Sequence, residues 1–163
     1  MMTIRKTDPK DIEAVLKIYE HAKEFMHTHG NPAQWADGYP NRKSLEADYE
    51  NGVSYVCLDG ENICGTFALL LTEEPTYRSI TGGSWRKDAS YGTIHRIASD
   101  GKTRGVSKAV FDFCSRICPY LRADTHENNL PMQRALVRYG FKSCGTIYVS
   151  DGTPRIAFDY IRE

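Results

Sequence analysis

The sequence predicts an α/β (α+β) fold in which a mixed, mostly antiparallel sheet of about seven strands is flanked by about four helices. Its 163 residues, 40% of them apolar and 26% charged, have the length and composition of a single globular domain over 1–163. Apolar residues recur at strand and helix spacing in the order β-α-α-β-β-β-α-β-α-β-β. No repeat, low-complexity tract or linker interrupts that order.

The first part of the chain is expected to contain one strand and two helices. The strand covers 3–6, and Asp8, followed by a proline, is expected to cap the first helix. That helix runs to about residue 28 on a stripe of apolar residues. The stripe consists of Ile12, Val15, Leu16, Tyr19, Ala22 and Met26. A turn-rich loop over 31–40 leads to a second helix over 42–51.

The rest of the chain alternates strands and helices around one long irregular segment. Strands are expected at 53–58, 63–71, 91–99, 120–125, 141–149 and 154–161. Asp-Gly pairs at 59–60 and 151–152 favour hairpin turns. Helices are expected from Arg104 to the residue before Pro119, and from the N-cap Asn129 to Gly140. The segment 73–89 is polar and long enough to suggest a role at a functional site.

Composition excludes several classes of partner. The 21 basic and 21 acidic residues balance, so overall charge gives no reason to expect nucleic acid or an anionic membrane. Five cysteines, most of them within apolar runs, favour buried, reduced thiols in a cytoplasmic protein. Cys114 and Cys118 have no second pair at ligand spacing, so no metal site is expected. No segment reaches the length of a signal sequence or a membrane span.

The turn after the strand at 91–99 is a candidate anion site. A helix N-terminus leaves backbone N–H groups without helical partners, and its dipole favours negative charge. The cations Lys102, Arg104 and Lys108 flank this turn, so a phosphate is the anion that the pattern favours. On this stretch alone, an ordinary strand–turn–helix connection with solvated basic residues is an equal alternative.

Two segments carry a resemblance to a known family. The first is Arg104-Gly105-Val106-Ser107-Lys108-Ala109, and the second runs from Asn129-Leu130-Pro131-Met132 to Tyr139-Gly140-Phe141. They resemble the pyrophosphate loop, Gln/Arg-x-x-Gly-x-Gly/Ala, and the Asn-x-x-Ala…Gly-Phe helix of the GNAT superfamily of acyl-CoA-dependent N-acyltransferases. Ser107 stands where the family usually has its central glycine; serine keeps the backbone N–H and adds a hydroxyl. The resemblance covers almost the whole chain and is weakest in 20–50 and 73–90.

The resemblance implies acetyl-CoA as the cofactor and assigns residues to it. The strand before the loop would diverge from its neighbour and pair with the pantetheine arm through Ile97 and Ser99. Asn129 would bond the pantetheine, and Met132 would pack beside it. The acetyl carbonyl would be polarised by a backbone N–H in the gap between the strands. The pyrophosphate would lie on the N–H groups of Arg104, Gly105, Val106, Ser107, Lys108 and Ala109.

Acetyl transfer needs a neutral amine, a stabilised oxyanion and a proton for the departing thiolate. His95 is expected to share a side-chain face with Ile97, two residues on, and is the first candidate for the base. A core histidine bonded to a neighbour is the alternative. His126, after the next strand, is the second candidate; a surface turn residue is its alternative. Leu136 stands where many family members have a proton-donating tyrosine, and nearby Tyr139 is not assigned that role.

The acceptor site is expected to have aromatic walls. Trp35, Tyr39 and Tyr148 are its candidate residues, and the alternative is that they pack in the core. Acidic residues would attract a cationic amine, with solvated surface acids as the alternative reading. The acids concerned are Asp37, Glu73 and Glu74.

The leading hypothesis is an acetyl-CoA-dependent N-acetyltransferase that acts on a primary amine of a small molecule or peptide, by direct attack in a ternary complex. The alternative is a non-catalytic acyl-CoA-binding sensor or scaffold, which Ser107 and Leu136 suggest. A third hypothesis is a nucleotide-binding regulator that uses the same anion site. A homodimer is expected only because such assemblies are common. The sequence does not identify the acceptor.

Overall fold

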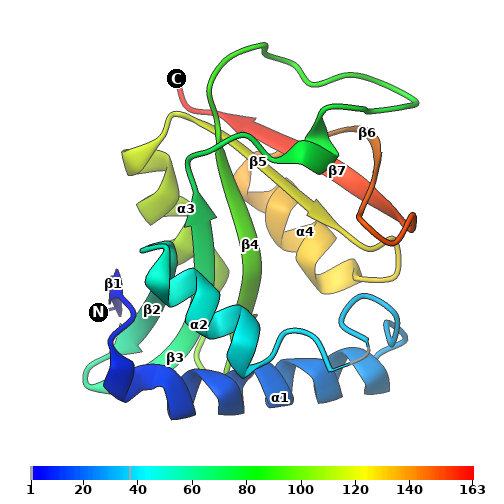
Figure 1. The fold of residues 1–163 in the computed structure, drawn as a ribbon. Coiled ribbons are helices and arrows are strands. Elements are labelled where there is room, and N and C mark those ends of the chain that lie inside the picture. Colours follow the sequence, from blue (N-terminus) through cyan, green and yellow to red (C-terminus); the bar gives the residue numbers. More distant parts are fainter. Residues whose placement is uncertain (1, 37) are drawn as a thin grey trace.

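The computed structural model describes residues 2–36 and 38–163, and this part of the chain contains seven strands and four α-helices (Figure 1). The strands are β1 (Met2–Lys6), β2 (Ser54–Asp59), β3 (Asn62–Leu70), β4 (Gly92–Ser99), β5 (Tyr120–Thr125), β6 (Lys142–Tyr148) and β7 (Pro154–Ile161). The helices are α1 (Ile12–Thr28), α2 (Arg42–Glu50), α3 (Val106–Ile117) and α4 (Leu130–Tyr139). Short 3-10 helices cover Pro9–Asp11 and Pro75–Tyr77. The expected order of elements is confirmed.

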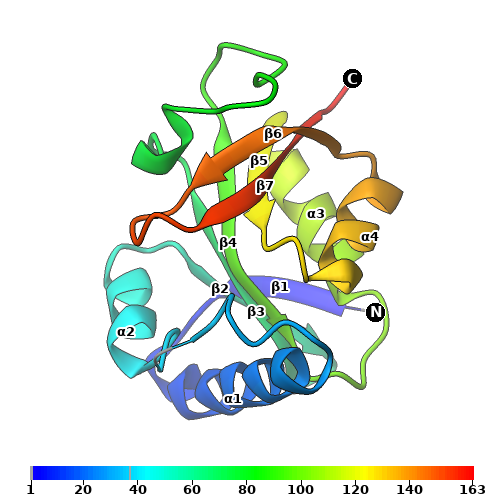
Figure 2. The ribbon, with the colours of Figure 1, turned by 90° about the vertical axis from the view of Figure 1, so that its right-hand side faces the viewer.

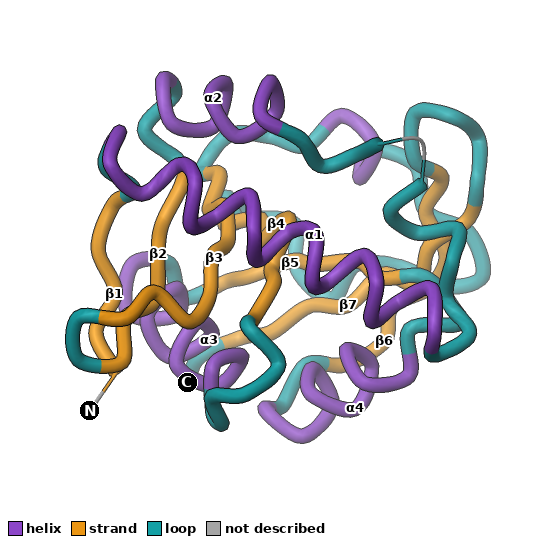
Figure 3. Tube along the Cα trace, turned by 90° about the horizontal axis from the view of Figure 1, so that it is seen from below, coloured by secondary structure: helices purple, strands orange, loops and turns teal. Residues whose placement is uncertain are grey.

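The strands form one mixed sheet in the order β1-β2-β3-β4-β5-β7-β6. The pair β4–β5 is parallel, and the other neighbouring strands are antiparallel. Helices α1 and α2 lie on one face of the sheet, and α3 and α4 lie on the other (Figure 3). The mixed, mostly antiparallel sheet that the sequence predicts is therefore present.

Apolar residues on the two faces form separate cores. The larger core lies between the sheet and the helices α3 and α4, and includes Val110, Phe111 and Leu136. The second lies beneath α1 and α2, and includes Val15 and Leu45. Each helix thus buries the apolar stripe that predicted it, which is the main source of its stability.

Of the two N-caps that the sequence predicts, Asn129 caps its helix and Asp8 does not cap the long helix α1. Asn129 caps α4, because its Oδ1 accepts a hydrogen bond from the N–H of Met132 at 3.2 Å. Asp8 does not cap the first long helix, as the sequence suggested. It begins the short turn Pro9–Asp11, where its N–H donates to the Asp11 carboxylate at 2.8 Å, and α1 starts only at Ile12. The buried Asp11, paired with Arg5, fixes that turn.

All five cysteines are free, and four of them are buried. Burial raises the pKa of the Cys57 thiol to about 12. Such thiols remain protonated and behave as small apolar side chains. No helix among the described residues is both long and apolar enough to cross a bilayer.

Candidate active site

Strands β4 and β5 pair only at their first residues. Gly92 lies opposite Leu121 and Thr93 opposite Arg122, and beyond them the strands diverge. In Figure 2, β5, β7 and β6 lie in the upper half of the molecule, and β1 to β3 lie in the lower half. From 94 to 99, the edge of β4 that faces β5 therefore has no strand partner in the described chain. Ile97 and Ser99 lie in this unpaired segment.

A cleft of about 600 Å³ occupies the gap between these strands. Residues from α3 and α4 and their flanks contribute one wall: Phe111, Asn129, Met132 and Leu136. The opposite wall comes from the loop after α1, the segment after β3, and the strands themselves, and includes Trp35, Tyr39, Glu74, His95, Asp124 and Arg155. The gap thus joins the two faces of the sheet, as a site for two reactants requires.

A bulge in β4 corrects the expected orientation of His95. The register with β3 passes from Ala68↔His95 to Thr66↔Ala98, so two steps along β3 match three along β4. The extra residue shifts the alternation of side chains. Ala98, not Ile97, therefore shares a face with His95. Consistently, Ala98 packs in the core beneath α1, whereas Ile97 packs against the core beneath α3 and α4.

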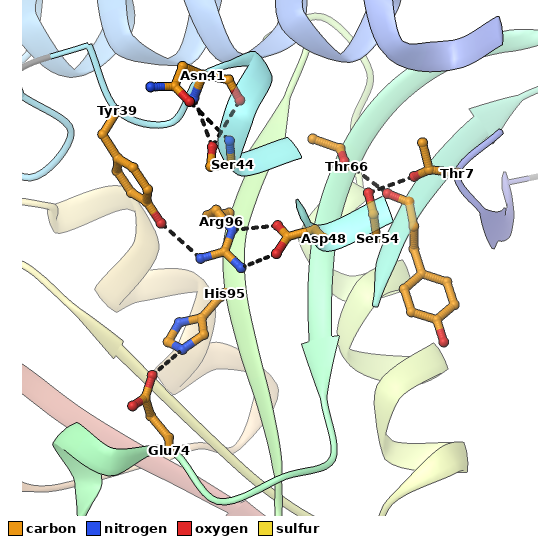
Figure 4. Close-up of polar contacts among 11 residues, drawn as sticks. Thr7, Tyr39, Asn41, Ser44, Asp48, Ser54, Thr66, Glu74, His95 and Arg96 are labelled. Atoms are coloured by element: carbon orange, nitrogen blue, oxygen red, sulfur yellow. Dashed lines mark hydrogen bonds and ion pairs between the residues drawn. The ribbon is translucent and has the colours of Figure 1, made fainter. Parts of the chain in front are cut away.

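Arg96 lies inside this bulge with a φ of 52°, in the left-handed region. Its Nε and Nη2 donate to the two carboxylate oxygens of Asp48, each at 2.7 Å, and its Nη1 donates to the hydroxyl of Tyr39 at 2.8 Å (Figure 4). Left-handed backbone is strained for a residue with a side chain, so these bonds help to hold the bulge.

His95 and Glu74 form a pair on the wall of the cleft. The His95 Nε2 lies 2.9 Å from Glu74 Oε1, and both side chains are about four-fifths buried (Figure 4). The second carboxylate oxygen accepts from the N–H of Thr76 at 3.0 Å. The hydrogen bond from His95, helped by that from Thr76, lowers the pKa of Glu74 to about 2. Glu74 is therefore a carboxylate at neutral pH, held beside an imidazole that faces the cleft.

Asp124 on β5 belongs to the same wall. The hydroxyl of the buried Tyr77 donates to Asp124 Oδ2 at 2.6 Å. Burial, followed by the charge of Asp124, raises the pKa of the Tyr77 hydroxyl well above its usual value. The Tyr77 ring centroid lies 6.3 Å from that of His95. Tyr77 is therefore a neutral donor that fixes the position of the Asp124 carboxylate.

The candidate aromatic residues divide into two groups. Trp35 lines the cleft and also packs edge-on against Tyr19, with ring centroids 6.1 Å apart, so it belongs both to the cleft wall and to the core beneath α1. Tyr39 lines the cleft and is partly exposed. Tyr148 ends β6, is half exposed, and is not among the residues that line the cleft.

His126 follows the last residue of β5 and is not among the cleft-lining residues of the described chain either. Its Nδ1 accepts a hydrogen bond from the N–H of Asn128 at 3.0 Å, within the turn before α4. Burial and the nearby charge of Arg155 lower the pKa of His126. The structure therefore brings His95, but not His126, together with the other candidate residues.

The turn before α3 presents free backbone donors. The N–H groups of Arg104 through Lys108 make no hydrogen bond to any described residue. Ala109 departs from the prediction, because its N–H donates to the carbonyl of Gly105 at 3.0 Å as the first bond of the helix. Gly105 adopts a φ of 81°, which glycine tolerates, and so allows the chain to turn into α3. Asp100 orders the preceding turn by accepting from the N–H of Lys102 at 2.9 Å.

Close packing places this turn against the sheet. A Cβ on Gly65 of β3 would lie 2.7 Å from Cγ1 of Val106, the first residue of α3. Only glycine at position 65 lets the start of α3 approach β3 so closely. The free donors are therefore fixed at the end of β4, on the side of the sheet where α3 and α4 lie.

Asn129 has a second partner that the sequence did not predict. Its Nδ2 donates to Oε1 of Gln34, in the loop after α1, at 3.0 Å. The same oxygen accepts from Asn31 Nδ2 at 3.0 Å. Gln34 thereby joins the loop that carries Trp35 to the start of α4. The amide that the resemblance assigns to pantetheine is bonded within the protein.

Leu136 is buried and lines the cleft, so an aliphatic side chain lies where the family often has a tyrosine. The hydroxyl of Tyr139 donates to Asp112 Oδ1 on α3 at 2.8 Å. Burial and Asp112 raise the pKa of Tyr139 to about 12. Tyr139 does not line the described part of the cleft, and the sequence assigned it no role as proton donor.

Several residues of the site are not predicted by the sequence. For Glu74 the sequence predicts only attraction of a cationic amine, because its pairing with His95 joins positions far apart in the chain. Gln34 and Asp124 carry no local signal. Arg155 has one, because it leads into the apolar run Ile156, Ala157 and Phe158 of β7. Of the acids proposed to attract an amine, Asp37 lies outside the described residues, and Glu73 pairs with Arg78.

No family model and no curated protein matches this chain. Solved structures do. A GNAT-family acetyltransferase of Streptococcus agalactiae superposes with a TM-score of 0.91 at 31% identity, covering 99% of this chain and 96% of that one. A GNAT-family acetyltransferase of Listeria monocytogenes gives 0.71 at 18% identity, with 98% and 94% covered. The ribosomal-protein-S18-alanine N-acetyltransferase of Escherichia coli gives 0.64 at 14%, with 100% and 96% covered.

The fold, with its diverging β4 and β5 and the helix that starts beside them, is that of an acyltransferase. The match of almost the full length to the Streptococcus agalactiae protein at 31% identity is more specific. This chain belongs to the GNAT family of acetyltransferases.

Proposed function

We propose that this protein is an acetyl-CoA-dependent N-acetyltransferase in which His95, oriented by Glu74, removes the proton from an amine acceptor. The observation that carries the proposal is the His95–Glu74 pair, 2.9 Å apart, on the wall of the cleft between β4 and β5. GNAT acetyltransferases generally use acetyl-CoA, so the cleft would hold this thioester and the amine together.

The residues present fit acetyl-CoA. The free N–H groups of 104–108 and the flanking cations Lys102, Arg104 and Lys108 suit a pyrophosphate. The edge of β4 without a strand partner suits the amide groups of a pantetheine arm, with Ile97 and Met132 beside it. When bound, acetyl-CoA supplies the acetyl group as a thioester. Ser107 leaves the N–H donors of the loop in place.

Glu74 would fix the tautomer of His95. A carboxylate that accepts from Nε2–H leaves Nδ1 with a lone pair, and Nδ1 makes no hydrogen bond to a described residue. That nitrogen would take a proton from the acceptor ammonium. The neutral amine then forms the new C–N bond as the C–S bond breaks. The nitrogen loses its second proton, and the departing sulfur gains one, so the products are an amide and a thiol.

A second candidate function rests on Leu136. With an aliphatic side chain in the cleft and Tyr139 bonded to Asp112, the described lining has no tyrosine on α4 to protonate a thiolate. A protein that binds acyl-CoA without turnover would have this feature. This hypothesis predicts tight CoA binding together with an absence of thiol release.

The test measures release of free thiol from acetyl-CoA with a panel of primary amines. We expect turnover by the parent protein, a loss of at least about 100-fold in kcat for His95→Ala, and a smaller loss for Glu74→Gln. His126→Ala and Glu73→Gln are matched controls, because His126 is outside the cleft lining and Glu73 contacts Arg78 instead. Both should retain activity within about threefold.

Two results would contradict the proposal. If CoA binds in calorimetry while no amine releases thiol, the sensor function replaces the enzyme. If His126→Ala, and not His95→Ala, removes turnover, the base has been misassigned. CoA binding by each variant should equal that of the parent, which separates loss of chemistry from loss of the fold.

A further inference from the structure

Arg155 is a buried cation in the cleft, on the wall opposite α3 and α4 where His95 also lies. Arg155 is the second residue of β7, it lines the cleft, and only 8% of its surface is exposed. Its register partner is Ile147 on β6, and the two side chains lie on the same face of the sheet. Ile147 packs with Tyr77 in a small core. Arg155 therefore lies on the face that carries Tyr77, away from α3 and α4.

Arg155 makes no direct ion pair with a described residue; the exposed Asp151 is linked to it only through the Thr153 hydroxyl, which donates to Asp151 Oδ1 at 2.6 Å. The Arg155 Nη1 donates to Thr153 Oγ1 at 3.0 Å and to the carbonyl of Pro154 at 2.9 Å, and both acceptors are neutral. No carboxylate of the described chain lies within 4.0 Å of it. Burying a charge without a partner is unfavourable, so such a group points to a ligand that completes it.

Two other arginines near the cleft have the partners that Arg155 lacks. Arg96 uses Nε and Nη2 to bind both oxygens of Asp48. Arg122 lies between aromatic rings, with its guanidinium carbon 4.0 Å from the Tyr91 ring centroid. In Arg155, Nε and Nη2 make no hydrogen bond to described residues. This is the same edge that Arg96 presents to a carboxylate, and it is the edge suited to bidentate recognition.

The effect of this charge is visible on its surroundings. Burial and the positive charge of Arg155 together lower the pKa of His126, so the field of this guanidinium extends to the turn after β5. The acids that line the cleft have other hydrogen-bond partners: Glu74 pairs with His95, Asp124 accepts from Tyr77, and Asp151 accepts from Thr153 at 2.6 Å, although the charge of Arg155 also helps to lower the pKa of Asp151. The end of the cleft near Arg155 is thus suited to an anion.

The order of strands relates Arg155 to the proposed base. His95 is on β4, Asp124 on β5 and Arg155 on β7, which are consecutive strands of the sheet. Two strand spacings of a regular sheet amount to about 10 Å between backbones, and the divergence of β4 from β5 beyond Thr93 widens the gap between His95 and Arg155. Side chains that extend from both sides shorten this span, and the cleft of about 600 Å³ between them has room for an amino acid. Trp35 and Tyr39 add apolar walls for its side chain.

We propose that Arg155 binds a carboxylate of the acceptor, so that the acceptors of this enzyme are amino-carboxylic acids whose amine reaches His95 while their carboxylate reaches Arg155. This inference rests on the proposed function, and it names the substrate class. Arg155 is a specificity-determining residue and takes no part in the proton transfers.

The test compares three acceptor sets: phenylalanine, leucine and methionine; their carboxamides; and the corresponding amines without the carboxyl group. Thiol release gives kcat/KM for the parent protein, for Arg155→Met and for Arg155→Lys. We expect Arg155→Met to lower kcat/KM for the acids by about 10- to 100-fold and to leave the amides and amines within about twofold. Arg155→Lys, which keeps the charge without the fork, should lie between. The exposed Arg138→Met is the matched control and should behave as the parent.

Removal of a carboxylate also changes the basicity of an amine, so the deciding quantity is the change that Arg155→Met causes in the ratio of acid to amide. Calorimetry of the same acids with the CoA-saturated protein gives a readout without turnover, and Arg155→Met should weaken that binding at least about tenfold. If amides and acids lose activity equally, the inference is overturned and the acetyltransferase stands. If no acceptor releases thiol but acids bind in an Arg155-dependent way, the acetyltransferase is overturned and the carboxylate site stands.

Discussion

The guanidinium of Arg96 binds the carboxylate of Asp48 through two parallel hydrogen bonds of 2.7 Å, although the two residues lie on β4 and α2. Both side chains are largely buried, with 16% and 12% exposed. This pair fixes the one residue other than glycine that has a positive φ in the described chain. It therefore holds the bulge that follows His95 on the wall of the cleft.

Asp48→Ala should lower the free energy of unfolding by about 3 kcal/mol, because it leaves a buried guanidinium with only the Tyr39 hydroxyl as a partner. Chemical denaturation with fluorescence detection measures this. Glu13→Ala breaks the exposed pair with Arg42 and is the control. Equal losses for the two variants would show that the Arg96–Asp48 pair has no special role.

Much of this fold follows from short-range patterns. Strands β5 and β7 have the bounds that alternation and turn residues predict, and Asn129 caps α4 as expected. These features depend on residues within a few positions of one another, where spacing and hydrogen-bonding capacity decide the conformation. The diverging strands followed from the resemblance to the GNAT family, because no local pattern encodes them.

The site was less predictable because its contacts join distant parts of the chain. The bulge at Arg96 has no signal in the sequence, since arginine does not favour a positive φ. It reversed the expected relation between His95 and Ile97. The pairing of His95 with Glu74 depends on where the segment after β3 returns to the sheet. Tertiary packing, not periodicity, sets these contacts.

The Glu74–His95 pair should make stability depend on pH in a defined window. In the folded protein the pKa of Glu74 is about 2, below its ordinary value of 4.5. A lowered pKa contributes stability that is fully present above pH 4.5 and is lost as pH falls toward 2. Glu74→Gln should therefore melt below the parent at pH 6, and the difference should shrink between pH 4.5 and 2.

Thermal unfolding followed by circular dichroism across this range measures the difference. Glu24→Gln is the control, because Glu24 is an exposed residue of α1. It should melt with the parent at every pH. A Glu74→Gln deficit that stays constant down to pH 2 would mean that the carboxylate charge does not contribute to the pairing.

The bond between Gln34 and Asn129 should compete with CoA. The Asn129 Nδ2 donates to Gln34 Oε1 at 3.0 Å, and the resemblance assigns the Asn129 side chain to pantetheine. A ligand that takes this donor must replace an existing hydrogen bond, which reduces the net gain on binding. Gln34→Met keeps the size of the side chain and removes the acceptor. It should tighten CoA binding by about two- to tenfold in calorimetry.

Two further variants isolate this competition. Gln133→Ala loosens the same turn, because Gln133 donates to the carbonyl of Glu127 at 2.8 Å, but it leaves the Gln34–Asn129 bond intact. It should not tighten CoA binding. Asn129→Asp keeps the oxygen that caps α4 and removes the Nδ2 donor, so Gln34→Met should have no further effect in that background. If Gln34→Met weakens CoA binding instead, Gln34 supports the site, and its bond to Asn129 orders the residue for pantetheine.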